Sequence, residues 1–400
     1  MQASIKISAG IFALMILFSV ASCDLAIVDP VPGSTGNATK FQTTIGGNGN
    51  DFPADILANA DGSFVVVGYS QSFTAQGDNQ AYIAKLDSKG NLLWEKDFGG
   101  PADDYAQAVT AAADGGYVFC GRTRSFNPNN NDDLFLVKVN SAGAKVWEKN
   151  YGATDTTEYA FGIIPVGTGD FLVAYRASIG NNQYIKTVKI NGNGSKKGAD
   201  KILRTGFIYP QKMIKTRDGK AAIAGTESIA GSGSAAYILK LTEDGSFVWE
   251  KSFPEQSPNF SPAYALAEMA NNDLILAGSD LGSNDHDFMM VRYSGIGARE
   301  ADKIWGGANA DELLAVTAGD GDEVAVAGYT GSFSGKNEIY LSKRKAADGA
   351  LVWEKHFLES WVQAIDVEWC PDGGLVVCTG QNAANADIII VKTDAQGNFQ

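Results

Sequence analysis

The 400-residue chain has few of the residues that carry familiar catalytic and metal chemistry. It contains two histidines, His286 and His356, and neither has a second histidine at metal-ligand spacing. No nucleophile elbow surrounds any serine. The four cysteines show no metal-ligand spacing either. The sequence therefore predicts no catalytic residue, no metal site and no cofactor.

Positive charge is also scarce. The chain has 32 Lys and Arg against 46 Asp and Glu, which gives a formal net charge of −14. Proteins that bind nucleic acid contact phosphates with a surplus of Lys and Arg, so we expect no nucleic-acid partner. A hydrophobic content of 44% is enough for a sizeable core, which excludes a disordered or fibrous chain.

The sequence has no apolar run long enough to span a bilayer comfortably. The apolar stretch at residues 7–20 follows Lys6 and ends in small residues, a pattern typical of a secretory signal. Residues 20–23, Val-Ala-Ser-Cys, resemble the bacterial lipobox. The resemblance implies cleavage before Cys23 and lipidation of that cysteine. An ordinary signal peptide with an incidental cysteine is the alternative.

The segment after Cys23 is predicted to be a flexible tether, because it contains Pro30, Pro32, Gly33 and Gly36. We expect a signal peptide at 1–22, the lipidated cysteine and tether at 23–40, and the main body at 41–400. The membrane is then a partner through the lipid anchor. We expect an exported protein in the bacterial cell envelope. The outer membrane is favoured, although Asp24 would mark inner-membrane retention in enteric bacteria.

The main body consists of sequence repeats. The clearest repeated phrase is a Lys, a short turn with Gly, and Trp-Glu-Lys, as in KLDSKGNLLWEK (85–96), KVNSAGAKVWEK (138–149) and KLTEDGSFVWEK (240–251). A second phrase ends in Gly-x-Ser/Thr, as in FVVVGYS (64–70) and YVFCGRT (117–123). The period is about 50 residues, the range of propeller blades. Seven such periods fill residues 41–400 and leave no room for another domain.

Each period reads as four short strands joined by tight turns, such as the Asp-Gly turn at 114–115. We therefore predict an all-β fold, a seven-bladed β-propeller of four-stranded antiparallel blades. The chain stops where the outer strand of the last blade should begin, and residues 41–47 match the end of such a strand. The N-terminal strand is thus expected to close the ring.

The Gly followed four residues later by Trp resembles the tryptophan-docking repeat. That repeat occurs in quinone-dependent dehydrogenases and in the propeller lipoprotein of the outer-membrane barrel-assembly machinery. The resemblance implies that each Trp docks structurally against the neighbouring blade, at Trp94, Trp147, Trp249, Trp305 and Trp353. The acidic residues and the vicinal cysteine pair of the quinone enzymes have no match here, so the activity of those enzymes is not expected.

Aromatic residues near the start of the first strands are candidates for ligand binding. Five of them lie nine residues before the Asp of the first turn: Phe52, Tyr105, Phe161, Tyr209 and Tyr264. Aromatic faces at a channel mouth suit sugar stacking or anchoring of a partner, and packing between blades is the alternative. Trp361 and Trp369 are further candidates, because the repeat does not account for them.

Acidic and amide residues offer weaker signals. The loops at 127–133 and 285–287 contain oxygen ligands suited to Ca²⁺, although solvated turns explain them better. The pairs Asp103-Asp104 and Asp311-Glu312 suit acid/base work on a glycan, with turn capping as the alternative.

We therefore expect a monomeric, non-enzymatic binding or scaffold lipoprotein that presents a loop-rich face to a protein or a polysaccharide. The alternative is a glycan-cleaving lyase or hydrolase that uses acids at the channel mouth.

Overall fold

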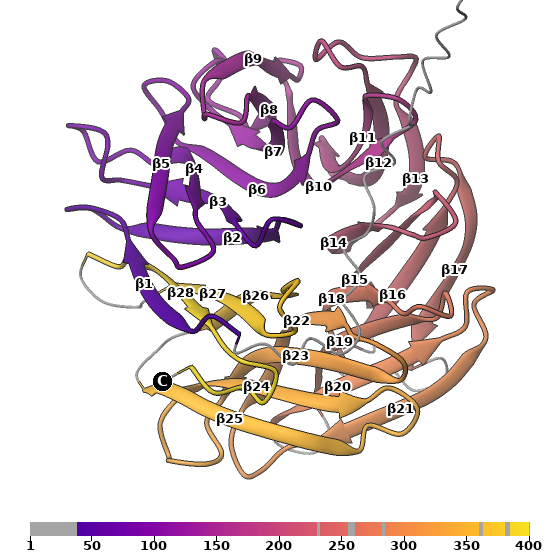
Figure 1. Cartoon of the computed structure of the whole chain (residues 1–400). Helices are drawn as coiled ribbons and strands as arrows, with labels where there is room; N and C mark the ends of the chain where they lie inside the picture. The colour runs from indigo at the N-terminus through magenta and orange to yellow at the C-terminus, as the bar shows by residue number, and fades with distance from the viewer. Residues whose placement is uncertain are drawn as a thin grey trace, which may run out of the picture.

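The computed structural model describes residues 38–229, 233–254, 261–281, 285–359, 363–380 and 385–399. These residues form seven four-stranded antiparallel sheets, and no helix occurs among them. The sheets are arranged as blades around a central axis (Figure 1). The predicted seven-bladed β-propeller is therefore confirmed.

Blades are numbered in chain order, and the first strand of each blade is the innermost. Blades 1 to 3 contain β2 Asp51–Ala58, β3 Phe64–Ser70, β4 Gln80–Leu86 and β5 Leu92–Phe98; β6 Asp104–Ala111, β7 Tyr117–Thr123, β8 Asp133–Val139 and β9 Lys145–Tyr151; and β10 Thr156–Val166, β11 Asp170–Ile179, β12 Asn182–Ile190 and β13 Lys201–Thr205. Blades 4 to 6 contain β14 Ile208–Lys215, β15 Ala221–Ile229, β16 Gly233–Leu241 and β17 Phe247–Phe253; β18 Ala263–Glu268, β19 Leu274–Leu281, β20 His286–Tyr293 and β21 Arg299–Trp305; and β22 Asp311–Ala318, β23 Glu323–Thr330, β24 Glu338–Lys345 and β25 Leu351–Glu359. Blade 7 contains β26 Gln363–Trp369, β27 Leu375–Gly380, β28 Ile388–Lys392 and the N-terminal β1 Phe41–Ile45.

The N-terminal strand closes the ring as predicted. β1 pairs with β28, with Phe41 opposite Lys392 and Ile45 opposite Ile388. In Figure 1 the indigo β1 lies beside the yellow β28. The N-terminal segment thus supplies the outer strand of blade 7 and completes its four-stranded sheet.

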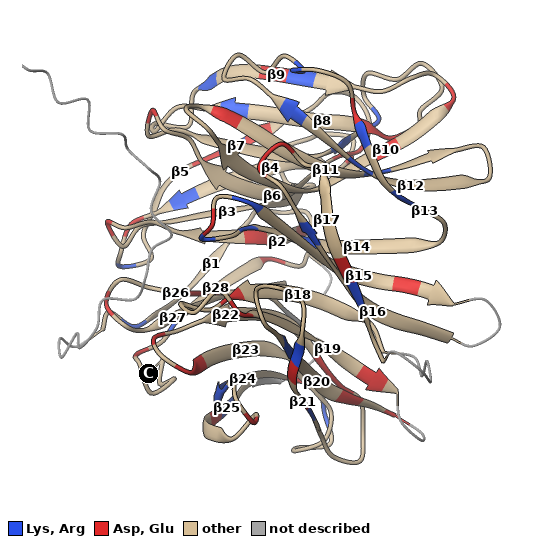
Figure 2. Ribbon diagram, turned by 90° about the vertical axis from the view of Figure 1, so that its right-hand side faces the viewer, with Lys and Arg blue, Asp and Glu red and all other residues tan. Residues whose placement is uncertain are grey.

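The two ends of the propeller differ. One end, the turn face, carries the short turns between first and second and between third and fourth strands. The other end, the loop face, carries the longer connections, such as residues 71–79 and 124–132. Core side chains lie between the blades, and the second and third strands are buried along most of their length. Figure 2 shows acidic and basic residues interspersed over the blades.

The repeated Trp on the fourth strand contacts the following blade near the turn face. The Trp94 Nε1 donates to the Ser141 carbonyl at 3.2 Å, and the Trp147 Nε1 donates to the Gly192 carbonyl at 2.9 Å. A Cβ atom on Gly143 would lie 2.8 Å from the Trp94 ring, and Gly143 has φ +78°, so only glycine fits that turn. The rings of Trp249 and Trp353 lie in the same way against the turn glycine of the next blade: Gly297 and Gly397. Trp305 differs, because its Nε1 donates to the Tyr340 hydroxyl at 3.3 Å.

The repeated Lys of the third strand pairs with the Asp of the first turn. The Lys138 Nζ lies 2.6 Å from Asp114, and the Lys392 Nζ lies 2.8 Å from Asp372. The lysines are nearly buried while the aspartates are partly exposed. These pairs neutralise a cation at the turn face of the blade, which explains why Lys recurs in the repeat.

Acidic residues at the start of first strands cap loops on the loop face. The Asp104 Oδ2 accepts hydrogen bonds from the Gly100 N–H at 2.8 Å and from the Ser125 hydroxyl at 2.6 Å. Asp311 accepts equivalent bonds from Gly307 and Ser332. Asp104 and Asp311 therefore cap turns, which leaves their neighbours Asp103 and Glu312 for other contacts. The described cysteines, Cys120, Cys370 and Cys378, are free and buried.

Candidate functional site

A cavity of about 490 Å³ lies on the axis where the seven first strands meet. Each first strand contains one β-bulge, and the seven bulged residues all line the cavity. They are Ala54, Gln107, Phe161, Gln211, Tyr264, Leu314 and Ile365. A bulge redirects the side chains around it and increases the local twist. The repeat therefore places one such residue per blade at the channel wall.

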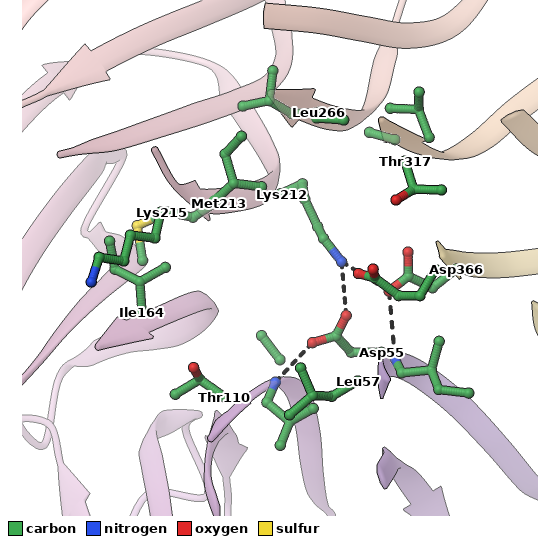
Figure 3. Close-up of a pocket in the computed structure, with 18 of the residues that line it drawn as sticks. Asp55, Leu57, Thr110, Ile164, Lys212, Met213, Lys215, Leu266, Thr317 and Asp366 are labelled. Carbon is green, nitrogen blue, oxygen red and sulfur yellow. Dashed lines mark hydrogen bonds and ion pairs between the residues drawn. The ribbon is translucent and has the colours of Figure 1, made fainter. Parts of the chain in front are cut away.

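The residue after each bulge shows which blades are specialised. In four blades it is small, as Ala108, Gly162, Ala265 or Ala315. In the other three it is charged: Asp55 in blade 1, Lys212 in blade 4 and Asp366 in blade 7. The Lys212 Nζ lies 2.7 Å from the Asp55 Oδ1 and 3.0 Å from the Asp366 Oδ2. Figure 3 shows the three side chains meeting in the cavity. We call this group the central triad.

The two carboxylates of the central triad also bind backbone N–H groups of the next blade. The Asp55 Oδ2 accepts from the Val109 N–H at 2.8 Å, and the Asp366 Oδ2 accepts from the Ile56 N–H at 3.4 Å. The innermost strands present an unpaired edge to the channel, so these bonds satisfy donors that would otherwise lack a partner. The triad therefore links blades 7, 1, 2 and 4 across the channel.

Burial and mutual proximity shift the protonation of this cluster. Burial raises the pKa of Asp55 to about 7, and the Lys212 ammonium only partly offsets that effect. Burial opposes the charge on Lys212, but the Asp366 and Asp55 carboxylates outweigh it and raise the lysine pKa well above its usual value. Glu368, which also lines the cavity, has its pKa raised to about 8 by burial and then by Asp366. The cavity thus holds carboxyl groups that titrate near neutral pH.

A second group of side chains lies at the loop-face end of the first and second strands. In blades 1 to 4, the residue two positions before the bulge is aromatic, and its register partner on the second strand faces the following blade. The paired positions are Phe52 with Tyr69, Tyr105 with Arg122, Tyr159 with Arg176, and Tyr209 with Thr226. We call these eight residues the mouth arc.

Neighbouring members of the mouth arc are in contact. The Tyr69 ring lies 5.2 Å from Phe52 and 5.0 Å from Tyr105, measured between centroids. The Arg122 guanidinium lies 4.2 Å from the Tyr105 ring centroid. The Arg176 guanidinium lies 4.9 Å from the ring of Tyr209, which is 42% exposed. The arc therefore presents aromatic and cationic planes from blade 1 to blade 4.

The structure separates the aromatic residues that the sequence places together. Phe52, Tyr105 and Tyr209 belong to the mouth arc, whereas Phe161 and Tyr264 are bulged residues that line the cavity. In the sequence, these aromatics are found by counting nine residues back from the Asp of the first turn. In blades 3 and 5 that Asp lies two residues later in the turn than in blades 1, 2 and 4. The count therefore reaches the bulged residue and not the residue two positions before it. Trp369 is 7% exposed, lines the cavity and packs between blades 6 and 7. Trp361 lies outside the described residues.

Sequence reasoning missed the central triad and five of the eight residues of the mouth arc. The missed arc members are Tyr69, Arg122, Tyr159, Arg176 and Thr226. A charged residue inside an apolar first strand is the signal for the triad, as in ADIL, QKMI and IDVE. Alignment of the repeats on the second-strand glycine, rather than on the turn Asp, would have placed these residues at one position.

A polar cluster occupies the loop face of blades 5 and 6. The His286 Nδ1 lies 3.3 Å from the Glu312 Oε1 and 3.3 Å from the Ser279 hydroxyl. Tyr264 and Tyr329 also hydrogen-bond to Glu312. Burial, followed by the charge of Glu312, raises the pKa of Tyr264 to about 12. Glu312 is thus a carboxylate held by two phenols and an imidazole.

The described residues contain no group of three or more His, Cys, Asp or Glu side chains arranged to hold a metal ion. In the loop at 127–133, the Asn127 side chain donates to the Asp133 Oδ1 at 2.8 Å. No helix within the described part of the chain is long and apolar enough to cross a membrane.

Comparison with known proteins identifies related folds. No family model and no curated protein sequence matches the chain. A polysaccharide lyase described as a PL25 ulvan lyase, bound to -[GlcA(1-4)Rha3S]-, superposes with a TM-score of 0.56 at 9% identity over 89% of this chain and 97% of its own. The polysaccharide lyase Uly1 gives 0.52 at 11% identity over 94% of each chain. A puromycin hydrolase gives 0.52 at 12% identity, over 92% of this chain and 55% of its own. At these identities the similarity establishes the fold alone.

Proposed function

We propose that the protein binds a polysaccharide across its loop face, through the mouth arc. The observation that carries this proposal is the run of aromatic side chains at one structural position in four successive blades. Sugar rings stack on such faces, and planar polar side chains beside them bind hydroxyl groups. A rigid propeller holds the arc in place without a cost in ordering on binding.

The place where the N-terminal segment joins the propeller supports binding at the loop face. The Thr39 N–H donates to the Asp372 Oδ2 at 3.2 Å in the first turn of blade 7, and Phe41 lies opposite Lys392 at the turn-face end of β28. The preceding chain therefore joins the propeller at the turn face. With a lipid on Cys23, as the lipobox resemblance implies, the turn face is directed toward the membrane and the loop face away from it. That arrangement presents the mouth arc to an extracytoplasmic ligand.

Glycan cleavage is a second candidate function, and the cluster around Glu312 favours it. A carboxylate, an imidazole and two phenols within hydrogen-bonding reach provide groups that can accept and donate protons. The cluster lies on the same face as the mouth arc. For this candidate function, the mouth arc binds the polysaccharide. His286 and Glu312 then transfer protons at the glycosidic bond that is cleaved.

Binding of the purified protein to an array of neutral and acidic polysaccharides tests both candidates. We expect Tyr105→Ala and Tyr209→Ala to weaken binding about ten-fold each, which corresponds to about 1.4 kcal/mol. Phe247→Ala is the matched control, because Phe247 is 50% exposed on the outer strand β17. Absence of binding to every polysaccharide contradicts the proposal.

The same samples are assayed for new reducing ends and for the ultraviolet absorbance of unsaturated products. Cleavage that is lost in His286→Gln and in Glu312→Gln supports the enzyme. Binding without cleavage leaves the non-enzymatic function.

A further inference from the structure

Arg176 differs from the other arginines on the loop face. Arg122 and Arg124 both pair with Asp132, at 3.2 Å and 2.8 Å, and Arg204 pairs with Glu227 at 2.7 Å. Arg176 makes no such pair within the described part of the chain, and its Nε is buried without a hydrogen-bond acceptor. Its guanidinium lies over the face of Tyr209. A partly buried guanidinium without an anion is energetically unfavourable, so it marks a place for an anionic ligand.

A second polar atom near Arg176 also lacks a partner. The Gln183 Oε1 is buried and makes no hydrogen bond within the described residues. Gln183 is the register partner of Ser178, two residues beyond Arg176, so its side chain is on the same sheet face as that of Arg176. A guanidinium donor and an amide acceptor without partners therefore lie on the face of blade 3 that packs against blade 4.

Exposed aromatic surface adjoins these polar groups. Phe207 is 62% exposed, and its neighbour Gly206 donates its N–H to the Gln183 carbonyl at 3.0 Å. A hollow of about 400 Å³ is lined by residues of both segments, including Gln183, Tyr184 and Phe207. We call Arg176, Gln183, Phe207 and Tyr209 the blade 3–4 subsite.

We propose that the blade 3–4 subsite binds an acidic sugar unit, with Arg176 holding its carboxylate or sulfate group. This inference rests on the proposed polysaccharide function and names the ligand class. The planar guanidinium presents paired donors that match a carboxylate or a sulfate. Tyr209 and Phe207 offer faces for the sugar rings, and the unpartnered Gln183 Oε1 accepts a hydrogen bond from a hydroxyl group. The net charge of −14 opposes non-specific attraction of polyanions, so selective binding depends on this local contact.

The test uses polysaccharides that differ only in charge. Polygalacturonate is compared with its methyl ester for the carboxylate, and dextran sulfate with dextran for the sulfate. Affinity is measured by calorimetry at low and at physiological salt. We expect the charged member of at least one pair to bind ten-fold more tightly or better.

Variants assign that preference to the subsite. Arg176→Gln should abolish the preference for the charged polymer, and Arg176→Lys should retain part of it. Arg299→Gln is the matched control, because Arg299 is 42% exposed on the outer strand β21. Thermal unfolding of each variant verifies that the propeller is intact.

The outcomes separate the two proposals. Equal binding of charged and uncharged polymers, or a preference that survives Arg176→Gln, overturns the acidic-sugar inference and leaves polysaccharide binding in place. No binding to these pairs or to the wider array overturns both.

Discussion

The turn face and the loop face of this propeller follow opposite rules. On the turn face, polar groups of the repeat have partners in the protein, as in the Lys138–Asp114 pair and the Trp147–Gly192 hydrogen bond. On the loop face of blades 3 and 4, Arg176, Gln183 and Thr226 keep buried atoms without partners. The repeated residues stabilise the ring, whereas residues that depart from the repeat in blades 3 and 4 keep donors and acceptors that a ligand can bind. The central triad combines both properties. Its residues depart from the repeat, but Lys212 forms ion pairs with Asp55 and Asp366 within the protein.

The largest expected effect comes from breaking the central triad. Lys212→Met keeps the length of the side chain but removes the cation between Asp55 and Asp366. Loss of one partner of a buried ion pair costs about 3–5 kcal/mol. Because the Lys212 side chain is 28% exposed to the channel, we expect a loss of about 3 kcal/mol in the free energy of unfolding, measured by denaturant titration near neutral pH.

Two comparisons make that result interpretable. Lys215→Met, on the same strand and without an ion-pair partner among the described residues, should change stability by less than about 0.5 kcal/mol. Adding Asp55→Asn and Asp366→Asn to Lys212→Met should recover part of the loss. Equal stability of Lys212→Met and the unmodified protein would show that the triad does not hold the ring together.

A smaller effect is expected on the turn face. Trp147→Ala removes a half-buried ring that covers Gly194 of the next blade and donates to the Gly192 carbonyl at 2.9 Å. Complete burial of the ring would make the loss about 3–5 kcal/mol, so we expect about 2 kcal/mol. Val146→Ala, whose side chain is 53% exposed beside it, should be nearly neutral.

The same variant sharpens the contrast between the faces. Trp147→Ala should leave polysaccharide affinity unchanged once the folded fraction is taken into account. Altered affinity in the folded protein would mean that the two faces are not independent.

The repeat explains why the fold is predictable and the site is not. Seven periods of about 50 residues, with recurring strand phrases and turn glycines, specify the blades, and the match between residues 41–47 and the end of a fourth strand specifies the closure. The central triad combines residues from three strands that are far apart in sequence. Considered alone, Asp55 or Lys212 is a charged residue inside an apolar strand, and the local sequence does not indicate its partner. Phe161 and Tyr264 lie at the bulge and not at the mouth-arc position, because first turns of equal length carry their Asp at different places in different blades. Only the strand register, with its bulges, aligns the blades correctly.

A dependence of stability on pH is expected to originate in the cavity. The pKa of Asp55 is raised from 3.8 to about 7 and that of Glu368 from 4.5 to about 8, so in the folded protein both carboxyls keep protons that they lose when unfolded. The unfolded state then binds fewer protons, and the free energy of unfolding falls as pH rises from about 4 toward 8. Glu368→Gln should flatten this slope from about pH 5 to 8, and most completely above the pKa of Asp55 near 7, when unfolding is measured in urea at a series of pH values. Glu300→Gln, an exposed substitution on β21, should leave the slope unchanged. If the Glu368→Gln curve runs parallel to that of the unmodified protein, Glu368 does not hold a proton in the cavity and the charge balance of the channel must be met by other groups.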